Sequence, residues 1–350
     1  MQPNTYLSET YALPNLPDAH LAVLNLDDPA LVAACAATAA HVALFHRDAR
    51  ALRDVQGRFG DHPRITIYED VFPPPGADYD AALLGVPKGR GLSRAMLARA
   101  WHSLKPGGAL YVSGPNHGGA KTAQTDLGAL APAQVLGHKA RHRIFRAIRP
   151  ATARIPAEWG TPWQPETRVF HVQGQDYTVY TQPGIFSYDH LDDGSAFLLD
   201  HLPALPAPDA PRVLDAGCGV GIIGLVAAEV YAARRVVWAD SDLLAVRAMQ
   251  LTRPAGDVVA ADLTHDLLAP YTPFDLILCN PPFHQDHATD TAFIRGFVPR
   301  ARQMLAPGGA LTLVFNSFLD YWNVLEAHFA EVHFIADNGR YQILAGKHPD

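Results

Sequence analysis

The chain has few cysteines, no excess of basic residues and no long apolar run. Three cysteines occur among 350 residues, and no two of them form a Cys-x-x-Cys pair. This argues against a disulfide framework and a zinc site, and it predicts a reducing compartment, the cytoplasm. No stretch approaches about 18 consecutive apolar residues, so we expect no membrane span. The N-terminus lacks the basic and apolar segments of a secretion signal.

The charge balance is acidic, with 28 Lys and Arg against 35 Asp and Glu and a net charge of −7. That sum points away from a non-specific nucleic-acid binder, although a local basic surface can exist on an acidic protein. One run without any acid lies between His138 and Arg154, and its cations are Lys139, Arg141, Arg143, Arg146, Arg149 and Arg154. Such a run is either a solvated face or a surface that contacts phosphate groups.

Predicted strands alternate with predicted helices in both halves of the chain, which indicates an α/β fold with doubly wound, mostly parallel sheets. In the first half we expect strands at 20–27, 42–45, 65–68, 79–84 and 109–112, with helices at 29–40, 49–58 and 92–104. Leu104-x-Pro106-Gly107-Gly108 recurs as Leu305-x-Pro307-Gly308-Gly309, and Val23-Leu24-Asn25 recurs as Val213-Leu214-Asp215. We interpret this as a duplicated domain; shared Pro-Gly-Gly turns are the alternative.

The two halves differ at the points where strands end. After its first strand the second half has Gly217, Gly219 and Gly221, whereas the first half has Asp27-Asp28-Pro29. Only glycines let a backbone approach a ligand closely there, so the first half is predicted to bind no cofactor. Proline and tryptophan between 156 and 165 mark the boundary. We therefore predict a degenerate domain at 1–158 and a functional one at 166–350.

In the second half, aspartates stand at three successive strand ends: Asp215 before the glycine loop, Asp240 and Asp262. With the glycine loop they indicate a nucleoside site, in which Asp240 accepts from ribose hydroxyls and Asp262 meets an adenine amino group. Asp215 would repel a pyrophosphate but suits the cationic end of S-adenosylmethionine (SAM). A dehydrogenase that uses NAD is the weaker interpretation of the same loop.

The sequence Asn280-Pro281-Pro282-Phe283 follows an apolar strand at 274–278. Two prolines make this a rigid loop that presents an amide, a carbonyl and an aromatic ring. Such a loop can hold a flat group that carries an amine. His284, Asp286, His287 and Asp290 follow at irregular spacing, so we expect no metal site.

With these motifs in place, the chain resembles class I SAM-dependent methyltransferases, and more narrowly the RsmC/RlmG-like ribosomal RNA guanine-N2 methyltransferases. The narrower resemblance rests on Asn280 to His284, Phe186 within Pro183-Gly184-Ile185-Phe186-Ser187, Asp192-x-Gly194-Ser195, and the tail from Phe315 to Tyr321. The resemblance covers the residues from about 170 to 350 well. Gln285-Asp286 departs from the family, in which a glycine is expected nearby.

The resemblance implies two tandem Rossmann-like methyltransferase domains, an inactive N-terminal copy that helps to bind RNA and a catalytic C-terminal copy. The expected catalytic residues are Asn280, Pro281 and Phe283. The expected cofactor-binding residues are Phe186, Asp192, Ser195, Asp215, Gly217, Gly219, Gly221, Asp240, Asp262 and Asn280. The expected RNA-binding residues are Lys88, Lys139, Arg141, Arg143, Arg146 and His284.

The implied reaction transfers the SAM methyl group to the N2 amine of a guanine in ribosomal RNA, most readily 16S RNA. The Asn280 oxygen and the Pro281 carbonyl would accept the two amine N–H groups while Phe283 stacks on the base. We expect a monomer whose partner is ribosomal RNA, free or within a ribosomal subunit. Alternative targets are a protein glutamine or a DNA adenine, and a further alternative is a non-catalytic RNA-binding or assembly factor.

Overall fold

The computed structural model describes residues 2–74, 76–152, 154–205, 207–282 and 287–349. The chain divides into two compact units. Unit 1 comprises Met1–Pro165 with Gln182–Gly184, and unit 2 comprises Glu166–Thr181 with Ile185–Asp350. Within the described ranges, no helix combines the length and the apolar character that crossing a membrane requires.

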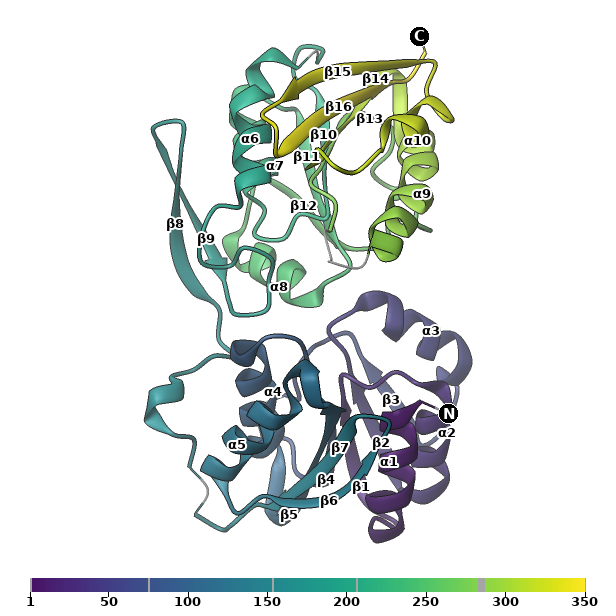
Figure 1. The fold of residues 1–350 in the computed structure, drawn as a ribbon, viewed down its shortest axis with the longest axis vertical. Coiled ribbons are helices and arrows are strands. Elements are labelled where there is room, and N and C mark those ends of the chain that lie inside the picture. Colours follow the sequence, from purple (N-terminus) through teal and green to yellow (C-terminus); the bar gives the residue numbers. More distant parts are fainter. Residues whose placement is uncertain (1, 75, 153, 206, 283–286, 350) are drawn as a thin grey trace. The chain divides into compact units, whose positions relative to one another are not determined.

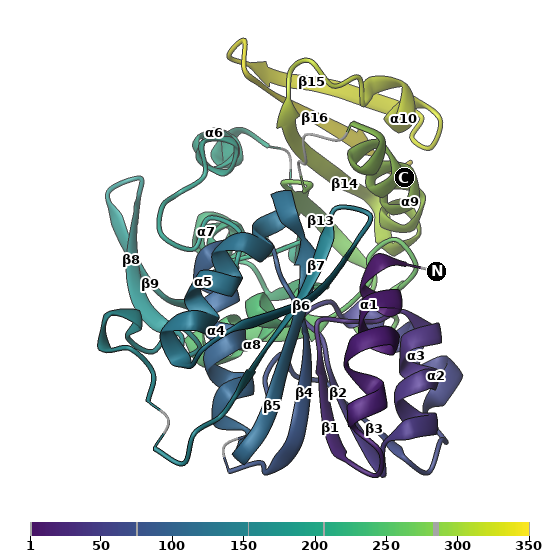
Figure 2. The same ribbon diagram turned by 60° about the horizontal axis from the view of Figure 1, so that its bottom comes forward.

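Unit 1 is built on a seven-stranded sheet in the order β3-β2-β1-β4-β5-β7-β6. The strands are β1 (His20–Leu24), β2 (His41–Phe45), β3 (Ile65–Tyr68), β4 (Tyr79–Gly85), β5 (Leu104–Pro115), β6 (Gln134–Lys139) and β7 (His142–Ile148). The helices are α1 (Pro3–Tyr11), α2 (Pro29–Thr38), α3 (Ala49–Phe59), α4 (Arg90–His102) and α5 (Lys121–Leu130). In Figure 1, α4 and α5 lie on one side of this sheet and α1 to α3 on the other, and Figure 2 shows the same division.

Unit 2 repeats this order of strands as β12-β11-β10-β13-β14-β16-β15. The strands are β10 (Arg212–Ala216), β11 (Arg235–Asp240), β12 (Gly256–Ala260), β13 (Phe274–Cys279), β14 (Leu305–Asn316), β15 (Glu331–Asp337) and β16 (Tyr341–Lys347). The helices are α6 (Asp193–His201), α7 (Ile222–Val230), α8 (Leu243–Thr252), α9 (His287–Met304) and α10 (Trp322–Glu326). A separate hairpin of β8 (Glu166–Val172) and β9 (Gln175–Thr181) precedes them.

The two sheets agree in detail as well as in order. β1 pairs β4 in parallel with Leu24 opposite Leu84, and β10 pairs β13 with Ala216 opposite Cys279. A carboxylate at the start of each fourth strand accepts from the backbone N–H that opens the first: Asp80 from His20 at 2.8 Å and Asp275 from Arg212 at 2.7 Å. This repetition confirms the predicted fold of two tandem α/β domains.

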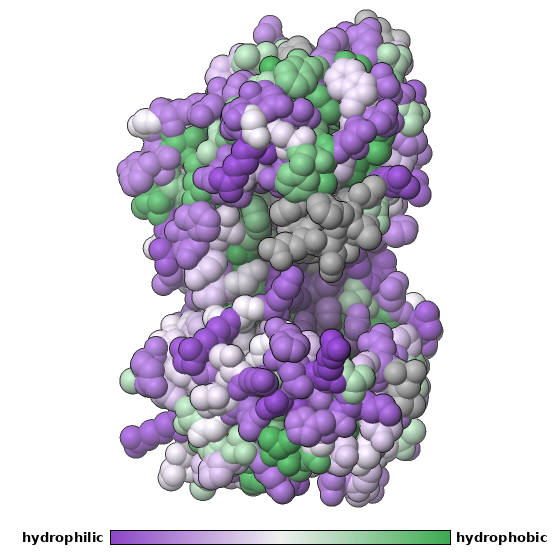
Figure 3. Space-filling model, viewed as in Figure 1, coloured by the Kyte–Doolittle hydropathy of each residue, from purple (hydrophilic) through white to green (hydrophobic). Residues whose placement is uncertain are grey.

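Burial in unit 2 follows the alternation of side chains along its strands. One face of the sheet and helix α9 form a continuous core that includes Leu214, Ile277, Leu311 and Phe297. The opposite face carries Trp238, which is also fully buried, and Asp215. On the face drawn in Figure 3, hydrophobic side chains of both units form only small patches in a mostly hydrophilic surface. The parallel core leaves the carboxyl ends of β10, β11 and β13 at one edge, where ligands bind in such sheets.

Two elements of unit 1 differ from the sequence-based prediction. Most of the basic run, for which the sequence predicted no strand, forms an antiparallel hairpin, β6–β7, in which the cations are mixed with the fully buried side chains of Ile144 and Phe145. Strand β5 begins at Leu104, before the Pro-Gly-Gly turn, whereas we predicted 109–112. Strand β5 pairs with β4 and β7, whose residues lie tens of positions away, so local signals could not reveal where it begins.

Candidate active site

Asn280 directly follows β13, and its side chain is fixed by the start of helix α6. The Nδ2 group donates to Asp192 Oδ2 at 2.8 Å and to Ser195 Oγ at 2.9 Å. Asp192 is the N-cap of α6, and the same Oδ2 accepts from the Ser195 backbone N–H at 2.9 Å. Pro281 is buried beside Asn280. The structure thus brings together residues that are 88 and 85 positions apart in the chain.

The glycine loop connects β10 to α7 in a conformation that requires glycine. Gly217, Gly219 and Gly221 have φ values of 73°, 53° and 80°. Residues other than glycine adopt this backbone region only at a cost in conformational energy. The Gly217 N–H donates to the Ala239 carbonyl at 2.8 Å, which anchors the loop to β11. A Cβ on Gly217 would meet no atom within 4 Å. The backbone at this position is therefore open to a ligand.

Asp215, at the end of β10, is fully buried. Its Oδ2 accepts from the Gly224 N–H in α7 at 2.8 Å, whereas Oδ1 has no hydrogen-bond partner among the described residues. Burial raises the pKa of this carboxyl from 3.8 to about 8; the Gly224 hydrogen bond lowers it and the nearby Asp240 charge raises it. At neutral pH the buried carboxyl therefore keeps its proton, and a cation bound beside it would favour the ionised form.

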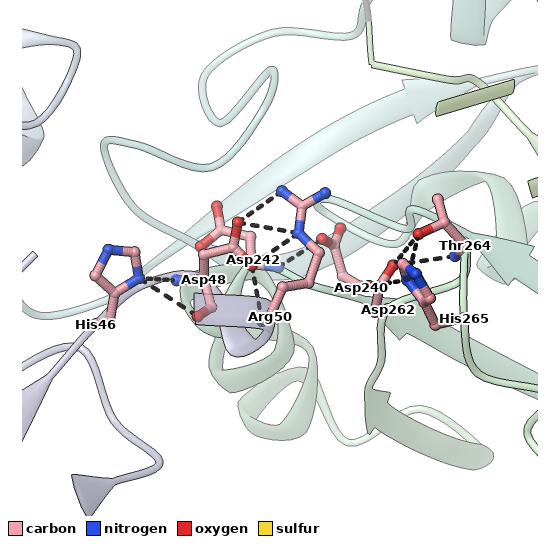
Figure 4. A network of polar contacts seen from close by, with 8 residues as sticks. All are labelled: His46, Asp48, Arg50, Asp240, Asp242, Asp262, Thr264 and His265. Carbon is pink, nitrogen blue, oxygen red and sulfur yellow. Dashed lines mark hydrogen bonds and ion pairs between the residues drawn. The ribbon is translucent and has the colours of Figure 1, made fainter. Parts of the chain in front are cut away.

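Asp240 and Asp262 stand at the ends of their strands as predicted, and both carboxylates hold neighbouring backbone. Asp240 accepts from Gly219 at 2.9 Å and from Asp242 at 2.8 Å. Asp262 accepts from the Thr264 hydroxyl at 2.6 Å, the Thr264 N–H at 3.0 Å and His265 Nδ1 at 2.7 Å, as Figure 4 shows.

These contacts determine the charge of Asp262. Burial alone would raise its pKa, but the hydrogen bonds from Thr264 and His265 outweigh burial and hold the pKa below 3.8. Asp262 is therefore ionised at neutral pH. Its contact with an adenine amino group, like that of Asp240 with a ribose, stays a prediction.

A cavity that opens to solvent lies between the glycine loop and the start of α6. Six of the predicted site residues line it: Phe186, Asp192, Ser195, Gly217, Gly219 and Asn280. The lining also includes Phe170 of β8, His190, Ile222 and Ile223, which the sequence did not single out. Phe170 has no local motif, and only the packing of the hairpin brings it here. Four other predicted cofactor-binding residues, Asp215, Gly221, Asp240 and Asp262, are not part of the lining.

Two predicted residues, Phe283 and His284, lie outside the described residues. Asp286 and the side chains of His287 and Asp290, which were weighed as metal ligands in the sequence, also lie outside the described residues. In the ranges that the structure describes, no three His, Cys, Asp or Glu side chains are grouped closely enough to hold a metal ion.

The corresponding edge of unit 1 is filled by the protein itself. Strand pairing makes Asn25 and Leu26 the counterparts of Gly217 and Cys218, which corrects the sequence-based match of Asn25 with Asp215 by two residues, and it makes Gly85 the counterpart of Asn280. A Cβ built on Gly85 would lie 2.4 Å from the Asn25 carbonyl oxygen and 2.7 Å from Leu26 Cδ2. The Asn25 amide donates to the Gly85 carbonyl at 3.1 Å. An apolar side chain thus packs against the position that carries the amide in unit 2.

The predicted RNA-binding residues of unit 1 lie on its loops and on the edge hairpin. Lys88 is exposed after β4. Arg143 donates to Asn116 and Gln124, both at 2.6 Å. The other cations lie on β6–β7 and its turn: Lys139 with Nζ 4.5 Å above the Tyr6 ring, Arg141 in the turn with φ 62°, and Arg146, 5.8 Å from the Tyr111 ring centre. Lys139 and Arg141 are exposed, whereas Arg143 and Arg146 are partly buried; together these four cations are called the basic edge below.

Comparisons with known proteins agree with this architecture. Residues 176–345 match the family described as methyltransferase small domain, and residues 13–148 match its N-terminal domain, methyltransferase small domain N-terminal. The 16S rRNA N2 G1207 methyltransferase (RsmC) of T. thermophilus, solved with AdoMet and guanosine, superimposes with a TM-score of 0.84. That match has 24% identity and covers 99% of this chain and 92% of that one, so it supports the fold.

Curated relatives carry the resemblance across both units. The ribosomal RNA small subunit methyltransferase C of Pseudomonas aeruginosa strain UCBPP-PA14 is 35% identical over 301 residues, covering 84% of this chain and 85% of its own. The protein of the same name from Hahella chejuensis is 32% identical over 281 residues, covering 79% and 80%. Shared identity at this level over both units shows common descent, and the chain belongs to the ribosomal RNA small subunit methyltransferase C family.

Proposed function

We propose that this protein transfers a methyl group from SAM to the N2 amine of a guanine in 16S ribosomal RNA. The observation that carries the proposal is the Asn280 side chain, whose Nδ2 is held by Asp192 and Ser195 at the rim of a cavity beside the glycine loop. The amide oxygen remains as the acceptor that an exocyclic amine needs. Membership of the family supplies the class of substrate.

The residues present fit SAM better than a dinucleotide. Bound SAM would supply a methyl group on a positively charged sulfur, together with an ammonium group. The Asp215 carboxyl keeps one oxygen without a partner among the described residues, and a cation bound beside it would favour its ionised form, whereas a pyrophosphate would not. Gly217 and Gly219 would lie against the cofactor, while Asp240 and Asp262 would hold its nucleoside.

The chain's own residues then orient the amine. Its lone pair is delocalised into the guanine ring, so the free amine is a weak nucleophile. The Asn280 Oδ1 and the Pro281 carbonyl accept its two N–H groups, which favours a tetrahedral nitrogen and directs the lone pair at the methyl group. Phe283 stacks on the base in this proposal. No group on the protein forms a covalent bond.

Unit 1 serves as the RNA-binding part in this proposal and holds no cofactor. The Leu26 side chain, which fills the edge where unit 2 has its glycine loop, supports this role. Lys88 and the basic edge of β6–β7 would contact backbone phosphates. The protein would act as a monomer in the cytoplasm, with RNA of an assembled or assembling small ribosomal subunit as its partner.

Methylation of small ribosomal subunits and of purified 16S RNA with labelled SAM, followed by nucleoside analysis, tests the proposal. We expect the label in N2-methylguanosine. Label in N6-methyladenine or in protein would refute the choice of target, and a failure to bind SAM would refute catalysis altogether.

Asn280→Ala is the matching variant. It should bind SAM as the wild type does and lose turnover by about 10²- to 10³-fold, the usual cost of removing an oriented polar group from a reaction centre. Asn323→Ala, on helix α10, is a control for loss of an amide elsewhere in unit 2; its Nδ2 contacts only Asp320 in the described part of the chain. Wild-type turnover by Asn280→Ala would contradict the assignment.

A further inference from the structure

We propose that Asp192 and Ser195 are positioning residues that set the rotation of the Asn280 amide, so that its oxygen and not its nitrogen faces the target amine. This goes beyond their place in the cavity lining, and it rests on the proposed function. The observation is a pair of hydrogen bonds that together use both protons of Asn280 Nδ2, at 2.8 Å and 2.9 Å.

The direction of these bonds follows from chemistry. An amide rotated by 180° about χ2 exchanges a donor for an acceptor, and nothing intrinsic to asparagine prefers one state. Asp192 Oδ2 can only accept, because it already receives the Ser195 backbone N–H at 2.9 Å. The rotated amide would place Oδ1 against that carboxylate oxygen, and two acceptors would then face each other.

The device that holds Asn280 is itself rigid. Asp192 caps helix α6, Ser195 lies in its first turn, and Ser195 is only 6% exposed. Gly194, between them, packs against the ring of Tyr341 so closely that an added Cβ would lie 3.1 Å from Cε1. The start of helix α6, the Tyr341 ring and the end of β13 therefore hold the two acceptors in place.

Variants at Asp192 separate the acceptor from the charge and from the helix cap. Asp192→Asn keeps an oxygen that can accept from both Ser195 and Asn280, so it should retain more of the wild-type kcat than a variant that lacks this acceptor. Asp192→Ser still caps the helix but is too short to reach Asn280, so its kcat should fall by about 10- to 100-fold, the usual worth of a hydrogen bond in an oriented site. Ser195→Ala should fall by a similar factor.

The coupling with Asn280 distinguishes positioning from a structural role. Adding Asp192→Ser to Asn280→Ala should reduce kcat no further, since the amide that it orients is gone. In the Asp192 and Ser195 variants, the change in the affinity for SAM should be smaller than the change in kcat. Asp193→Asn is the matched control: it is the adjacent carboxylate, 66% exposed, and its Oδ2 pairs with Arg340. It should behave as the wild type.

Three results would overturn the proposal: wild-type kcat in Asp192→Ser, an equal further loss in the Asn280→Ala background, or a loss confined to the affinity for SAM. A second measurement is independent of catalysis. The side-chain amide signals of Asn280 in asparagine-labelled protein should shift and exchange faster with solvent in Asp192→Ser and Ser195→Ala, and not in Asp193→Asn; unchanged signals would refute the contact. If wild-type protein methylates no RNA, the proposed function fails while this measurement still decides the amide's orientation.

Discussion

The buried carboxyl of Asp215 should make the stability of unit 2 depend on pH in an unusual direction. Its pKa is about 8 in the folded protein and 3.8 in the reference state. The folded state therefore holds a proton that the unfolded state has lost between these values. Stability falls as the pH rises through this window, by about 1.4 kcal/mol per pH unit for one group.

The size of the effect follows directly. Each of the three pH units between 3.8 and 7 lowers the free energy of unfolding by roughly 1.4 kcal/mol. At about pH 7 the total loss is therefore about 4 kcal/mol. Asp215→Asn has a similar shape and retains an oxygen for the Gly224 N–H, but it does not titrate. The free energy of unfolding of the variant, relative to that of the wild type, should rise by about 3 kcal/mol from about pH 5.5 to about pH 7.5.

Urea unfolding across this pH range, followed by circular dichroism and tryptophan fluorescence, measures the effect. Because two domains can unfold separately, the transition of unit 2 must be identified first, and the buried Trp238, paired with Asp215 across β10 and β11, is a suitable reporter. Parallel pH dependence in the variant and the wild type would refute a raised pKa. The opposite slope would mean that the carboxylate is stabilised as an anion.

Two further predictions concern packing and RNA. Gly224→Ala should destabilise unit 2 by about 1–3 kcal/mol, as overpacking does, because the added Cβ would lie 2.3 Å from Trp238 Nε1 and 3.0 Å from Asp215 Cβ; Gly128→Ala, whose added Cβ meets nothing within 4 Å, is the control in thermal unfolding. Lys139→Ala should weaken RNA binding and reduce the slope of log affinity against log salt by about 0.7–0.9 if the ammonium contacts one phosphate; an unchanged slope would place the basic edge outside the interface.

Much of the fold could be predicted from the sequence because parallel strands are short apolar runs between helices. The repeated Pro-Gly-Gly turns pointed to the duplication that the two sheets confirm. Hairpin β6–β7 could not be predicted in this way, since its alternating cations look like a solvated charge run. Its strand character comes from pairing with β5, whose partner residues lie tens of positions away.

The site was predictable where residues act as local motifs. Gly217, Gly219 and Asn280 line the cavity because each directly follows a strand. The contact of Asn280 with Asp192 was not predictable, since it joins residues 88 positions apart. The orphaned oxygen of Asp215 is likewise a property of packing, because the sequence shows a carboxyl group but not which of its atoms finds a partner.

The Leu26 side chain at the edge of unit 1 has a thermodynamic consequence. A domain whose ligand pocket is filled by its own side chain has the same stability at any concentration of the ligand. Unit 2 gains stability from any ligand that binds only its folded state, by about 2.7 kcal/mol at a ligand concentration 100 times Kd. Scarcity of a ligand that binds unit 2 would therefore lower the stability of unit 2 and leave that of unit 1 unchanged.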